Sequence, residues 1–483
     1  MKRDKDFLTN GGIKQKSIGL GLCSKKLTTI GGYRMKTFKK VSSIILILIM
    51  VLSIVGCGKT SNNTENPDKG TDNDKGTVNA EPIELTVWSV NEIHSEMWKF
   101  GEEAYNKKNP EAPIKVNVEI LPNAEMHNKL LMALQTGTGA PDVADINLNF
   151  YTNFTSKNIQ LAPLDDVVER AYSEGNYEKS RFDLYKVKDS IYALPTHVGA
   201  TVTYYNMDII EQAGFTISDV DAIETWDQYN EMGKTVLEKT GVPMTCFEVS
   251  NQRPFWPMIV QHGGDYLTKD NEVILDSQNN IEVLDYMLGM YKSGVAIQAG
   301  GGATSTEEFY SFMNEGSVAS LTMPSWYMSR FLNYMPNLEG KIAIRPMPVF
   351  VKGEPRTVGI GGTGTAITNQ CKNIDVAKEF LYEAKLSYDS NINIWSKLAF
   401  DPVNLDTWKD PELLKASDYF YGESFFEIMA PYISDCLSPA NADLSVAAQD
   451  LVNNTIMYSV FVDQSRTPEE ALKSAAEELR AQQ

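Results

Sequence analysis

Cysteine is scarce in this sequence, which contains five among 483 residues. They are Cys23, Cys57, Cys246, Cys371 and Cys436, and no two of them have the spacing of a zinc-binding pair. The pattern argues against a metal site built on cysteine. Only three cysteines follow Cys57, so they form at most one disulfide, and we expect buried free thiols instead.

Positive charge is in short supply outside the N-terminus. Residues 1–57 hold eleven Lys and Arg against two Asp, whereas residues 58–483 hold 33 Lys and Arg against 61 Asp and Glu, a formal charge of −28. A chain this acidic repels nucleic acids and anionic lipid surfaces. We therefore expect no nucleic-acid partner, and we interpret the acidic surface as a source of solubility.

Familiar catalytic motifs are missing as well. The sequence contains neither G-x-S-x-G nor H-E-x-x-H. Residues 359–364 do match G-x-G-x-x-G, but residues 365–368 continue as a strand pattern rather than opening a helix, as a dinucleotide site requires. We expect these glycines to form a turn or to bring the backbone close to a cleft. The sequence thus predicts no catalytic residues, no cofactor and no metal.

The N-terminal apolar run is too short to cross a membrane. Residues 41–55 form a run of 15 residues that follows the basic segment 36–40, whereas a transmembrane helix needs about 20. A basic segment, a short apolar run and small residues before a cleavage point are typical of a secretory signal. Cleavage is therefore favoured over an uncleaved anchor.

The end of that run, Ile54-Val-Gly-Cys57, resembles a bacterial lipobox. The resemblance implies that the Cys57 thiol is acylated and becomes the new N-terminus, with an ordinary signal peptide as the alternative. Residues 35–56 would then be the signal peptide, and residues 1–34 an over-extended start upstream of Met35. The protein would be extracytoplasmic and held to the cell membrane only by the lipid on Cys57.

The segment that follows Cys57 is too polar to fold. Residues 59–80 consist mainly of Asn, Asp, Gly, Lys and Thr, so they cannot bury enough apolar surface to offset the entropy of ordering. We assign residues 57–81 to the lipidated cysteine and a disordered tether. A flexible chain of this length has an end-to-end distance of about 25 Å.

From residue 82 onward, strand patterns and helix patterns alternate. A strand is predicted at 83–88, followed by a helix in which Ile93, Met97, Phe100 and Ala104 share one face. Further strands are expected at 115–120, 142–146 and 201–206, and helices at 126–135 and 207–213. The segments 225–228 and 467–470 have the pattern of capping boxes that open helices. This alternation predicts an α/β fold with a largely parallel sheet.

The order of these landmarks resembles the family 1 extracellular solute-binding proteins, the maltose-binding-protein-like group, over nearly all of residues 82–483. The matching segments are Leu85-Thr-Val-Trp88, Ala140-Pro-Asp-Val143, Leu161-Ala-Pro-Leu-Asp165, Tyr192-Ala-Leu-Pro195, Tyr204-Tyr-Asn206, Ala213-Gly214, Thr225-Trp226, Trp256 with His262-Gly-Gly264, Phe312-Met-Asn-Glu-Gly316, Pro346-Met-Pro348 and Ala377-Lys-Glu-Phe380. Each segment is short, but their order and spacing together are specific.

The resemblance implies a two-lobed fold of the periplasmic-binding-protein type with three hinge crossings. The N-terminal lobe would comprise residues 82–197 and 348–399, and the C-terminal lobe residues 202–342 and 403–483. The crossings are placed near 198–201, 343–347 and 400–402. The resemblance also implies a monomer that captures a carbohydrate, in particular an oligosaccharide, in the cleft and delivers it to the permease subunits of an ABC transporter.

A sugar site needs aromatic rings for the apolar faces of the sugar and polar side chains for its hydroxyls. Ligands of open α/β sheets bind at the carboxyl ends of the strands. The residues at or just after the first and third predicted strands are therefore candidates, namely Trp88, Asn91, Glu92, Asn147 and Asn149. For a loop residue the alternative is simple exposure to solvent, and for a tryptophan it is burial in the core.

Four further candidates come from the resemblance to the family. Trp326 follows a strand at a position where an aromatic ring often stacks on sugar. Residues 251–256 match a cleft segment, which nominates Arg253 as a contact and Trp256 as a contact or a support. The polar residues of this segment differ from those of maltose binders, so the sugar is left open, including an acidic one that Arg253 would bind. His197, beside the first crossing, is the fourth.

Two other functions stay open at this point. A secreted glycoside hydrolase needs two carboxylates about 5–10 Å apart, and 61 acidic residues after residue 57 leave such a pair possible. A binder of a non-sugar polar solute, such as a peptide or a polyamine, is the other alternative.

Overall fold

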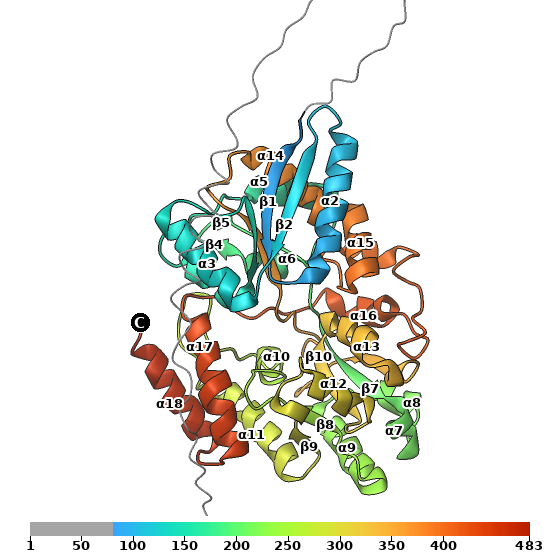
Figure 1. The fold of residues 1–483 in the computed structure, drawn as a ribbon. Coiled ribbons are helices and arrows are strands. Elements are labelled where there is room, and N and C mark those ends of the chain that lie inside the picture. The colour runs from blue at the N-terminus through green and yellow to red at the C-terminus, as the bar shows by residue number, and fades with distance from the viewer. Residues whose placement is uncertain (1–80) are drawn as a thin grey trace, which may run out of the picture. The chain divides into compact units, whose positions relative to one another are not determined.

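The computed structural model describes residues 81–483, which belong to one compact unit, Thr77–Gln483 (Figure 1). The predicted over-extended start, the signal peptide, Cys57 and the tether up to residue 80 lie outside the described residues. Within residues 81–483, no helix combines the length and the apolar character that crossing a bilayer requires.

The first sheet has five strands in the order β2-β1-β3-β12-β6. Their bounds are Ile83–Ser89 for β1, Ile114–Ile120 for β2, Val143–Asn147 for β3, Thr363–Ile367 for β12 and Leu194–Pro195 for β6. β1 is parallel to both β2 and β3, as expected for strands joined by crossover helices. β12 is antiparallel to β3 and to β6.

The second sheet has three strands in the order β10-β7-β11. Their bounds are Thr201–Asn206 for β7, Ser320–Pro324 for β10 and Ile342–Pro346 for β11, and β7 is antiparallel to both neighbours. Every residue of β7 is buried. Tyr204 packs into one hydrophobic cluster and Tyr205, on the opposite face, into another, so this sheet separates two cores.

Helices cover both sheets (Figure 1). They are α2 Ser95–Lys108, α3 Asn123–Thr136, α4 Leu148–Thr155, α5 Asp165–Glu174, α6 Lys179–Asp183, α7 Met207–Gln212, α8 Ile217–Asp221, α9 Trp226–Thr240, α10 Phe255–Gln261, α11 Gln278–Lys292, α12 Glu307–Asn314, α13 Met328–Tyr334, α14 Ile374–Lys385, α15 Tyr388–Leu398, α16 Phe425–Ile433, α17 Ser445–Leu451 and α18 Pro468–Arg480. Short helical turns include η1 Glu92–His94, η3 Ser325–Tyr327 and η5 Leu405–Lys409. Two small sheets pair β4 Lys186–Val187 with β5 Ser190–Ile191 and β8 Thr245–Phe247 with β9 Ala296–Gln298.

The α/β class is confirmed, but among the described strands parallel pairing is confined to β1, β2 and β3 of the first sheet and to the small β8–β9 pair. The second sheet is antiparallel, as are the pairings of β12. The alternation rule fixes the direction of strands that follow one another through a single helix. β7, β10 and β12 pair with strands from distant parts of the chain, and the local pattern contains no information about their direction.

Helix termini follow their local signals. α9 begins with the expected capping box of Thr225 and Gln228, and α18 with that of Thr467 and Glu470. α3 ends at Gly137, whose φ of 75° lies in the left-handed region that favours glycine. Caps are short-range devices, so sequence reasoning predicts them well.

The buried face of α2 differs from the predicted one. Met97 is buried as expected, but Phe100 and Ala104 are only half-buried, and Ile93 lies before the helix. The cause is α14, which packs against α2 at Gly101. A Cβ at Gly101 would lie 2.4 Å from the Cβ of Ala384, so the close approach of the two helices requires glycine there.

Cys246, Cys371 and Cys436 are buried and unpaired, which confirms the expected free thiols.

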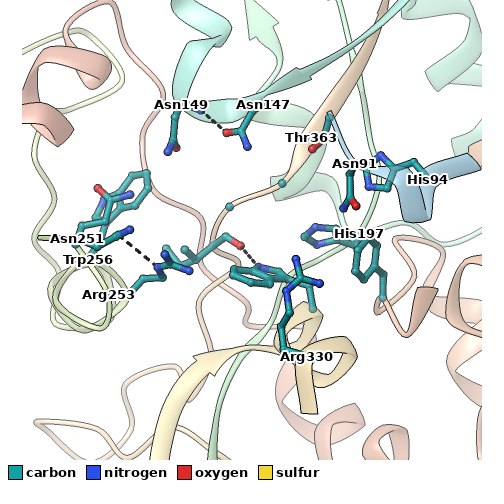
Figure 2. Close-up of a pocket in the computed structure, with 16 residues that line it drawn as sticks. Asn91, His94, Asn147, Asn149, His197, Asn251, Arg253, Trp256, Arg330 and Thr363 are labelled. Atoms are coloured by element: carbon teal, nitrogen blue, oxygen red, sulfur yellow. Dashed lines mark hydrogen bonds between the residues drawn. The ribbon is translucent and has the colours of Figure 1, made fainter. Parts of the chain in front are cut away.

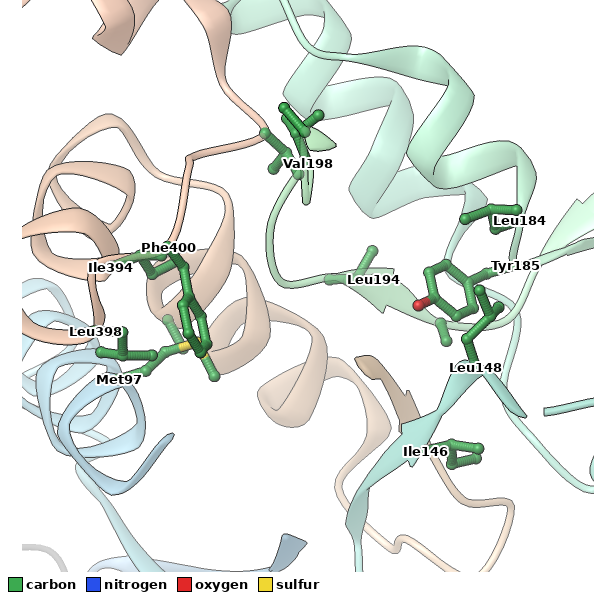
Figure 3. Close-up of a cluster of buried hydrophobic side chains, with 14 of the residues drawn as sticks. Met97, Ile146, Leu148, Leu184, Tyr185, Leu194, Val198, Ile394, Leu398 and Phe400 are labelled. Carbon is green, nitrogen blue, oxygen red and sulfur yellow. The ribbon is translucent and has the colours of Figure 1, made fainter. Parts of the chain in front are cut away.

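A hydrophobic core lies around Phe400. Figure 3 shows Phe400 together with Met97, Ile394 and Leu398, and all four side chains are buried. Phe400 thereby joins α2 and α15 to the extended segment after α15. This packing fixes the position of the residues that follow it.

Three chain segments meet beside this core. The Asp401 carboxylate accepts the backbone N–H groups of Gly199 and Ala200, both at 2.9 Å, and Ala200 forms a β-bridge with Gly359. The buried Arg181 guanidinium donates to the carbonyl groups of Gly359 and Gly361. Burial raises the pKa of Asp401 to about 6, while its hydrogen bonds and the Arg181 charge oppose that shift.

Candidate functional site

Residues from both sheets line one pocket of about 240 Å³. Residues at or after the carboxyl ends of β1, β3 and β10 contribute to it, as does the first residue of β12. The lining consists of Asn91, His94, Asn147, Asn149, His197, Asn251, Gln252, Arg253, Trp256, Trp326, Arg330, Ile360, Gly361, Gly362, Thr363 and Phe400 (Figure 2). The pocket therefore occupies the place where open α/β sheets bind ligands.

Two asparagines of the pocket are fixed by the backbone next to them. Asn91 precedes η1, and its side-chain oxygen accepts the N–H of Ile93 at 3.3 Å. Asn147 precedes α4, and its oxygen accepts the N–H of Asn149 at 3.1 Å (Figure 2). Asparagine is favoured at such N-cap positions because it satisfies a free backbone donor. Each cap leaves the side-chain amino group for another partner.

Trp326 is half-buried at the pocket. It lies in η3 directly after β10, and its indole N–H donates to the carbonyl of Ile360 at 3.2 Å. The Arg253 guanidinium lies 5.7 Å from the centre of the ring. The hydrogen bond holds the indole in place through its edge, so part of its apolar surface stays accessible to a ligand.

Arg253 forms an ion pair with the carboxylate of Glu248. Its Nε lies 3.1 Å from Oε2 of Glu248, which is buried. The other Glu248 oxygen accepts the N–H of Thr304 at 2.6 Å and its hydroxyl at 2.8 Å. The Glu248 charge thus compensates that of Arg253 and positions the guanidinium at the pocket.

Trp256 is buried and fully engaged with its neighbours. Its indole N–H donates to Asp265 at 2.9 Å, and its ring stacks on Tyr266 with centroids 5.2 Å apart. Burial raises the pKa of Asp265 to about 6, while the bonds from Trp256 and two backbone N–H groups oppose that shift. Trp256 therefore gives the pocket a fixed apolar wall rather than a polar contact.

His197 is buried at the pocket and stays neutral. Its Nδ1 lies 3.9 Å from Asp401 and has no hydrogen-bond partner in the described part of the chain. Burial holds the pKa of His197 well below its usual value, and the charges of Arg181, His94 and Lys385 lower the pKa further. The imidazole is uncharged at pH 7 as a result.

His94 is tied to a buried polar network. Its Nδ1 lies 2.9 Å from Asp145, which also accepts the hydroxyl groups of Ser89 at 2.7 Å and Thr365 at 2.6 Å. Lys385 donates to Thr365 at 2.6 Å. Burial alone would raise the pKa of Asp145, but His94 and Lys385 more than offset this, so the pKa lies below its ordinary value. Asp145 is therefore a carboxylate at neutral pH.

The structure brings seven of the nine residues predicted from the sequence to this pocket. They are Asn91, Asn147, Asn149, His197, Arg253, Trp256 and Trp326. Trp88 and Glu92 do not line it. Trp88 is part of β1, and its ring is buried. The Nζ of Lys129 in α3 lies 4.0 Å from the centre of that ring. Glu92 begins η1 and is exposed to solvent.

Comparison with known proteins identifies the family. The chain matches the family described as bacterial extracellular solute-binding protein over residues 88–382. It is also 37% identical over 448 residues to the arabinooligosaccharide-binding protein of Bacillus subtilis, covering 92% of this chain and 99% of that protein. This chain is a bacterial extracellular solute-binding protein. The resemblance found in its sequence is thereby confirmed.

Other relatives of this solute-binding protein agree. The arabinooligosaccharide-binding protein of Halalkalibacterium halodurans is 39% identical over 401 residues, which are 82% of this chain and 89% of that protein. Among solved structures, the GacH receptor of Streptomyces glaucescens matches with a TM-score of 0.68 at 18% identity, covering 83% of this chain and 98% of that one. Maltose-bound MalE3 of T. maritima matches with a TM-score of 0.66 at 20% identity, and the match covers 83% of this chain and 100% of that one. These structures show that the fold is that of the maltose-binding-protein-like group.

A solute-binding protein is the non-enzymatic component of a transporter, so the prediction that this chain is not an enzyme is confirmed by its family. The chemistry of the pocket agrees with that role. None of the lining residues, all within residues 81–483, is Asp or Glu. The two carboxylates that most glycosidases place across the scissile bond are therefore not available at this pocket of the solute-binding protein.

Sequence reasoning missed several lining residues of the solute-binding protein, above all His94, Arg330, Thr363 and Phe400. Two of them had a usable signal. His94 lies in the same loop as the predicted Asn91, and Arg330 follows Trp326 by four residues in consecutive helical turns, a spacing that puts both on one side. Thr363 pairs with Asn147 across β12 and β3, a long-range contact that has no local signal.

Proposed function

We propose that this solute-binding protein captures an arabino-oligosaccharide outside the cell and delivers it to the permease subunits of an ABC importer. Two curated relatives at 37% and 39% identity, which this chain matches over 99% and 89% of their length, are named arabinooligosaccharide-binding proteins. Identity at this level over whole chains supports transfer of the ligand class.

The observation that carries the proposal is the combination of side chains in the pocket. Trp326 offers an aromatic ring that is held at its edge, and Phe400 offers a second apolar surface. Amide and guanidinium groups line the same pocket, including those of Asn147, Arg253 and Arg330 (Figure 2). Rings for the apolar faces of a sugar and directed polar groups for its hydroxyls make up a carbohydrate site.

The proposal includes a cleft between two lobes that close on the ligand. The N-terminal lobe, residues 82–197 and 348–399, would carry the first sheet, and the C-terminal lobe, residues 202–342 and 403–483, the second. The pocket draws on both, since Asn147 is the last residue of β3 in the first sheet and Trp326 follows β10 of the second. A ligand that contacts both lobes would favour the closed state.

The crossings proposed at 198–201 and 400–402 are supported by their contact. Asp401 binds the N–H groups of Gly199 and Ala200, which ties the two segments together at one point. A shared pivot of this kind lets the lobes rotate without separating. The third crossing is proposed at 343–347, at the end of β11.

The proposed tie to the membrane is a lipid on Cys57. The replacement Cys57→Ser should leave the protein uncleaved or release it to the medium, because a hydroxyl group cannot form the thioether. Labelling cells with a radioactive or alkyne-bearing fatty acid measures this directly. Equal labelling of the variant and the parent protein would refute the lipobox interpretation.

Calorimetric titration tests the proposed ligand. We expect arabinotriose to bind with a dissociation constant in the micromolar range or tighter, and maltose and galactobiose to bind at least about tenfold more weakly. Tight binding of maltose or galactobiose together with no heat from arabinotriose would reject the arabino-oligosaccharide assignment while retaining a sugar binder. No heat from any of the three would reject the carbohydrate proposal.

A further inference from the structure

The polar groups of the pocket are mostly hydrogen-bond donors. The side-chain oxygens of Asn91 and Asn147 already accept backbone N–H groups, and that of Asn251 lies 3.4 Å from Nε of Arg253. The amino groups of these asparagines therefore remain for a ligand. Arg253 and Arg330 have no acceptor atom. A sugar hydroxyl both donates and accepts, so a sugar site also needs acceptors.

Carboxylates do not supply these acceptors, because no lining residue in the described part of the chain is acidic. The amide oxygen of Asn149 and the hydroxyl group of Thr363 are side-chain acceptors of the pocket, and the imidazoles of His94 and His197 are two more. Both are more than nine-tenths buried, with 2% and 6% of their surface exposed. Both meet the Phe400 ring edge to face, at centroid distances of 5.9 and 5.1 Å. Figure 2 shows the two imidazoles close together at the same side of the pocket.

The orientation of the His94 imidazole follows from Asp145. That carboxylate is fully buried and ionised, so it has no proton to donate. The 2.9 Å bond between them therefore requires a proton on Nδ1 of His94. The other ring nitrogen, Nε2, makes no hydrogen bond within residues 81–483. In a neutral ring it carries a lone pair.

A buried lysine completes the polar network around Asp145. Lys385 is buried in the same network and shares the Thr365 hydroxyl with Asp145. It also donates to Thr196 at 2.8 Å, and burial lowers the pKa of Lys385 to about 7, although the Asp145 charge opposes that shift. The bond to Asp145 therefore decides which ring nitrogen of His94 is left for a ligand. A carboxylate that accepts a hydrogen bond from one ring nitrogen of a histidine fixes the orientation of the ring, and it thereby positions the other ring nitrogen for a ligand.

We propose that Nε2 of His94 accepts a hydrogen bond from a hydroxyl group of the bound sugar, in a pocket where imidazoles take the place of carboxylates as acceptors. His94 is then a specificity-determining residue, and Asp145 and Lys385 are positioning residues that act through it. The inference rests on the proposed function, since it requires a ligand that donates hydroxyl protons.

Two replacements of His94 separate its roles. In His94→Asn the shorter amide still reaches Asp145, but it offers no acceptor at the position of Nε2. In His94→Gln the longer amide places an oxygen near that position. We expect calorimetry with arabinotriose to show at least about tenfold weaker binding for His94→Asn, and a smaller loss for His94→Gln. His262→Gln, a histidine outside the pocket, is the matched control and should bind like the parent protein.

Nitrogen-15 NMR of histidine-labelled parent protein tests the tautomer without any variant. We expect the Nε2 of His94 to give the shift of an unprotonated nitrogen in the free protein and to move when arabinotriose is added. A protonated Nε2, or equal arabinotriose affinity of folded His94→Asn and the parent protein, would overturn the inference while leaving the proposed function intact. If the parent protein binds no sugar, the proposed function fails instead, and with it the hydroxyl partner of His94. If both variants fail to fold, the NMR measurement alone decides.

Discussion

Two tryptophans at strand ends, Trp326 and Trp88, occupy different environments. Trp326 is half-buried at the pocket, whereas Trp88 is buried in the core beneath Lys129. Both are predicted as contacts, Trp88 because it ends a strand and Trp326 because it follows a strand at a position that the resemblance to the family assigns to an aromatic ring. They make a matched pair for experiment.

Trp326→Ala should weaken arabinotriose binding by at least about tenfold. The replacement removes a ring contact that contributes about 0.5–1.5 kcal/mol beyond the area it buries, and about 1.4 kcal/mol corresponds to one decade of affinity. The melting temperature of the free protein should change little, since the side chain is only half-buried. Calorimetry and thermal unfolding measure both quantities on one sample.

Trp88→Ala should show the reverse behaviour. Loss of a buried ring costs about 3–5 kcal/mol of folding stability, while the folded fraction should keep the parent affinity. If Trp326→Ala instead lowered the melting temperature strongly and retained affinity, the stacking role of Trp326 would have to be abandoned.

His197 should make the protein less stable in acid. Its pKa in the folded state lies well below 6.5, its value in an unfolded chain. Between these two values the unfolded chain binds a proton that the folded protein does not, so stability falls as the pH falls below about 6.5 and is unaffected by this group above that pH. Uptake of one proton by the unfolded chain alone lowers the free energy of unfolding by about 1.4 kcal/mol for each pH unit.

Denaturant unfolding of the parent protein and of His197→Asn between pH 7.5 and 5 measures this slope. Asp401, whose pKa is raised to about 6, contributes in the opposite direction but is present in both proteins. We expect the parent protein to lose stability with acid more steeply than His197→Asn. Parallel curves for the two proteins would mean that His197 is protonated as easily in the folded state as in the unfolded one.

At the scale of elements, two helical glycines allow a test of helix packing. Gly101 of α2 has no room for a Cβ because Ala384 of α14 would lie 2.4 Å away, whereas Gly289 of α11 has no atom within 4 Å of that position. Gly101→Ala should destabilise the protein by about 1–3 kcal/mol through overpacking. Gly289→Ala should stabilise it by up to about 1 kcal/mol through helix propensity. Unfolding in denaturant measures the change in stability that each replacement causes. Equal changes in stability for Gly101→Ala and Gly289→Ala would contradict the packing described for α2 and α14.

The elements that sequence reasoning predicted correctly have short-range causes. β7 and the capping boxes at Thr225 and Thr467 depend on residues within a few positions of one another. The buried face of α2 was predicted incorrectly because it depends on α14, about 280 residues further along the chain. The antiparallel second sheet was missed for the same reason.

The candidate site likewise contains features that the local sequence can predict and features that depend on distant parts of the chain. Asn147 could be nominated because strand ends are visible in the sequence, and Trp326 because it follows a strand at a position that the resemblance to the family assigns to an aromatic ring. The tautomer of His94 could not, because it depends on Asp145, Thr365 and Lys385, which come from β3, β12 and α14. Long-range polar networks of this kind become apparent only once the fold is known.

At the scale of the whole molecule, the proposal of two lobes predicts a change of shape. Small-angle scattering should give a smaller radius of gyration with saturating arabinotriose than without it, since a ligand that contacts both lobes favours the closed state. A sugar that does not bind in calorimetry serves as the control and should leave the radius unchanged. An unchanged radius with saturating arabinotriose would count against closure around a hinge.

A crystal structure of the protein grown with arabinotriose would show whether the pocket binds this sugar. We expect sugar density in the pocket, with one ring against Trp326, a hydroxyl near Nε2 of His94 and contacts to Asn147 at the end of β3 and to residues after β10. Arabinotriose bound elsewhere on the protein, or a pocket filled only with water at saturating sugar, would contradict this expectation.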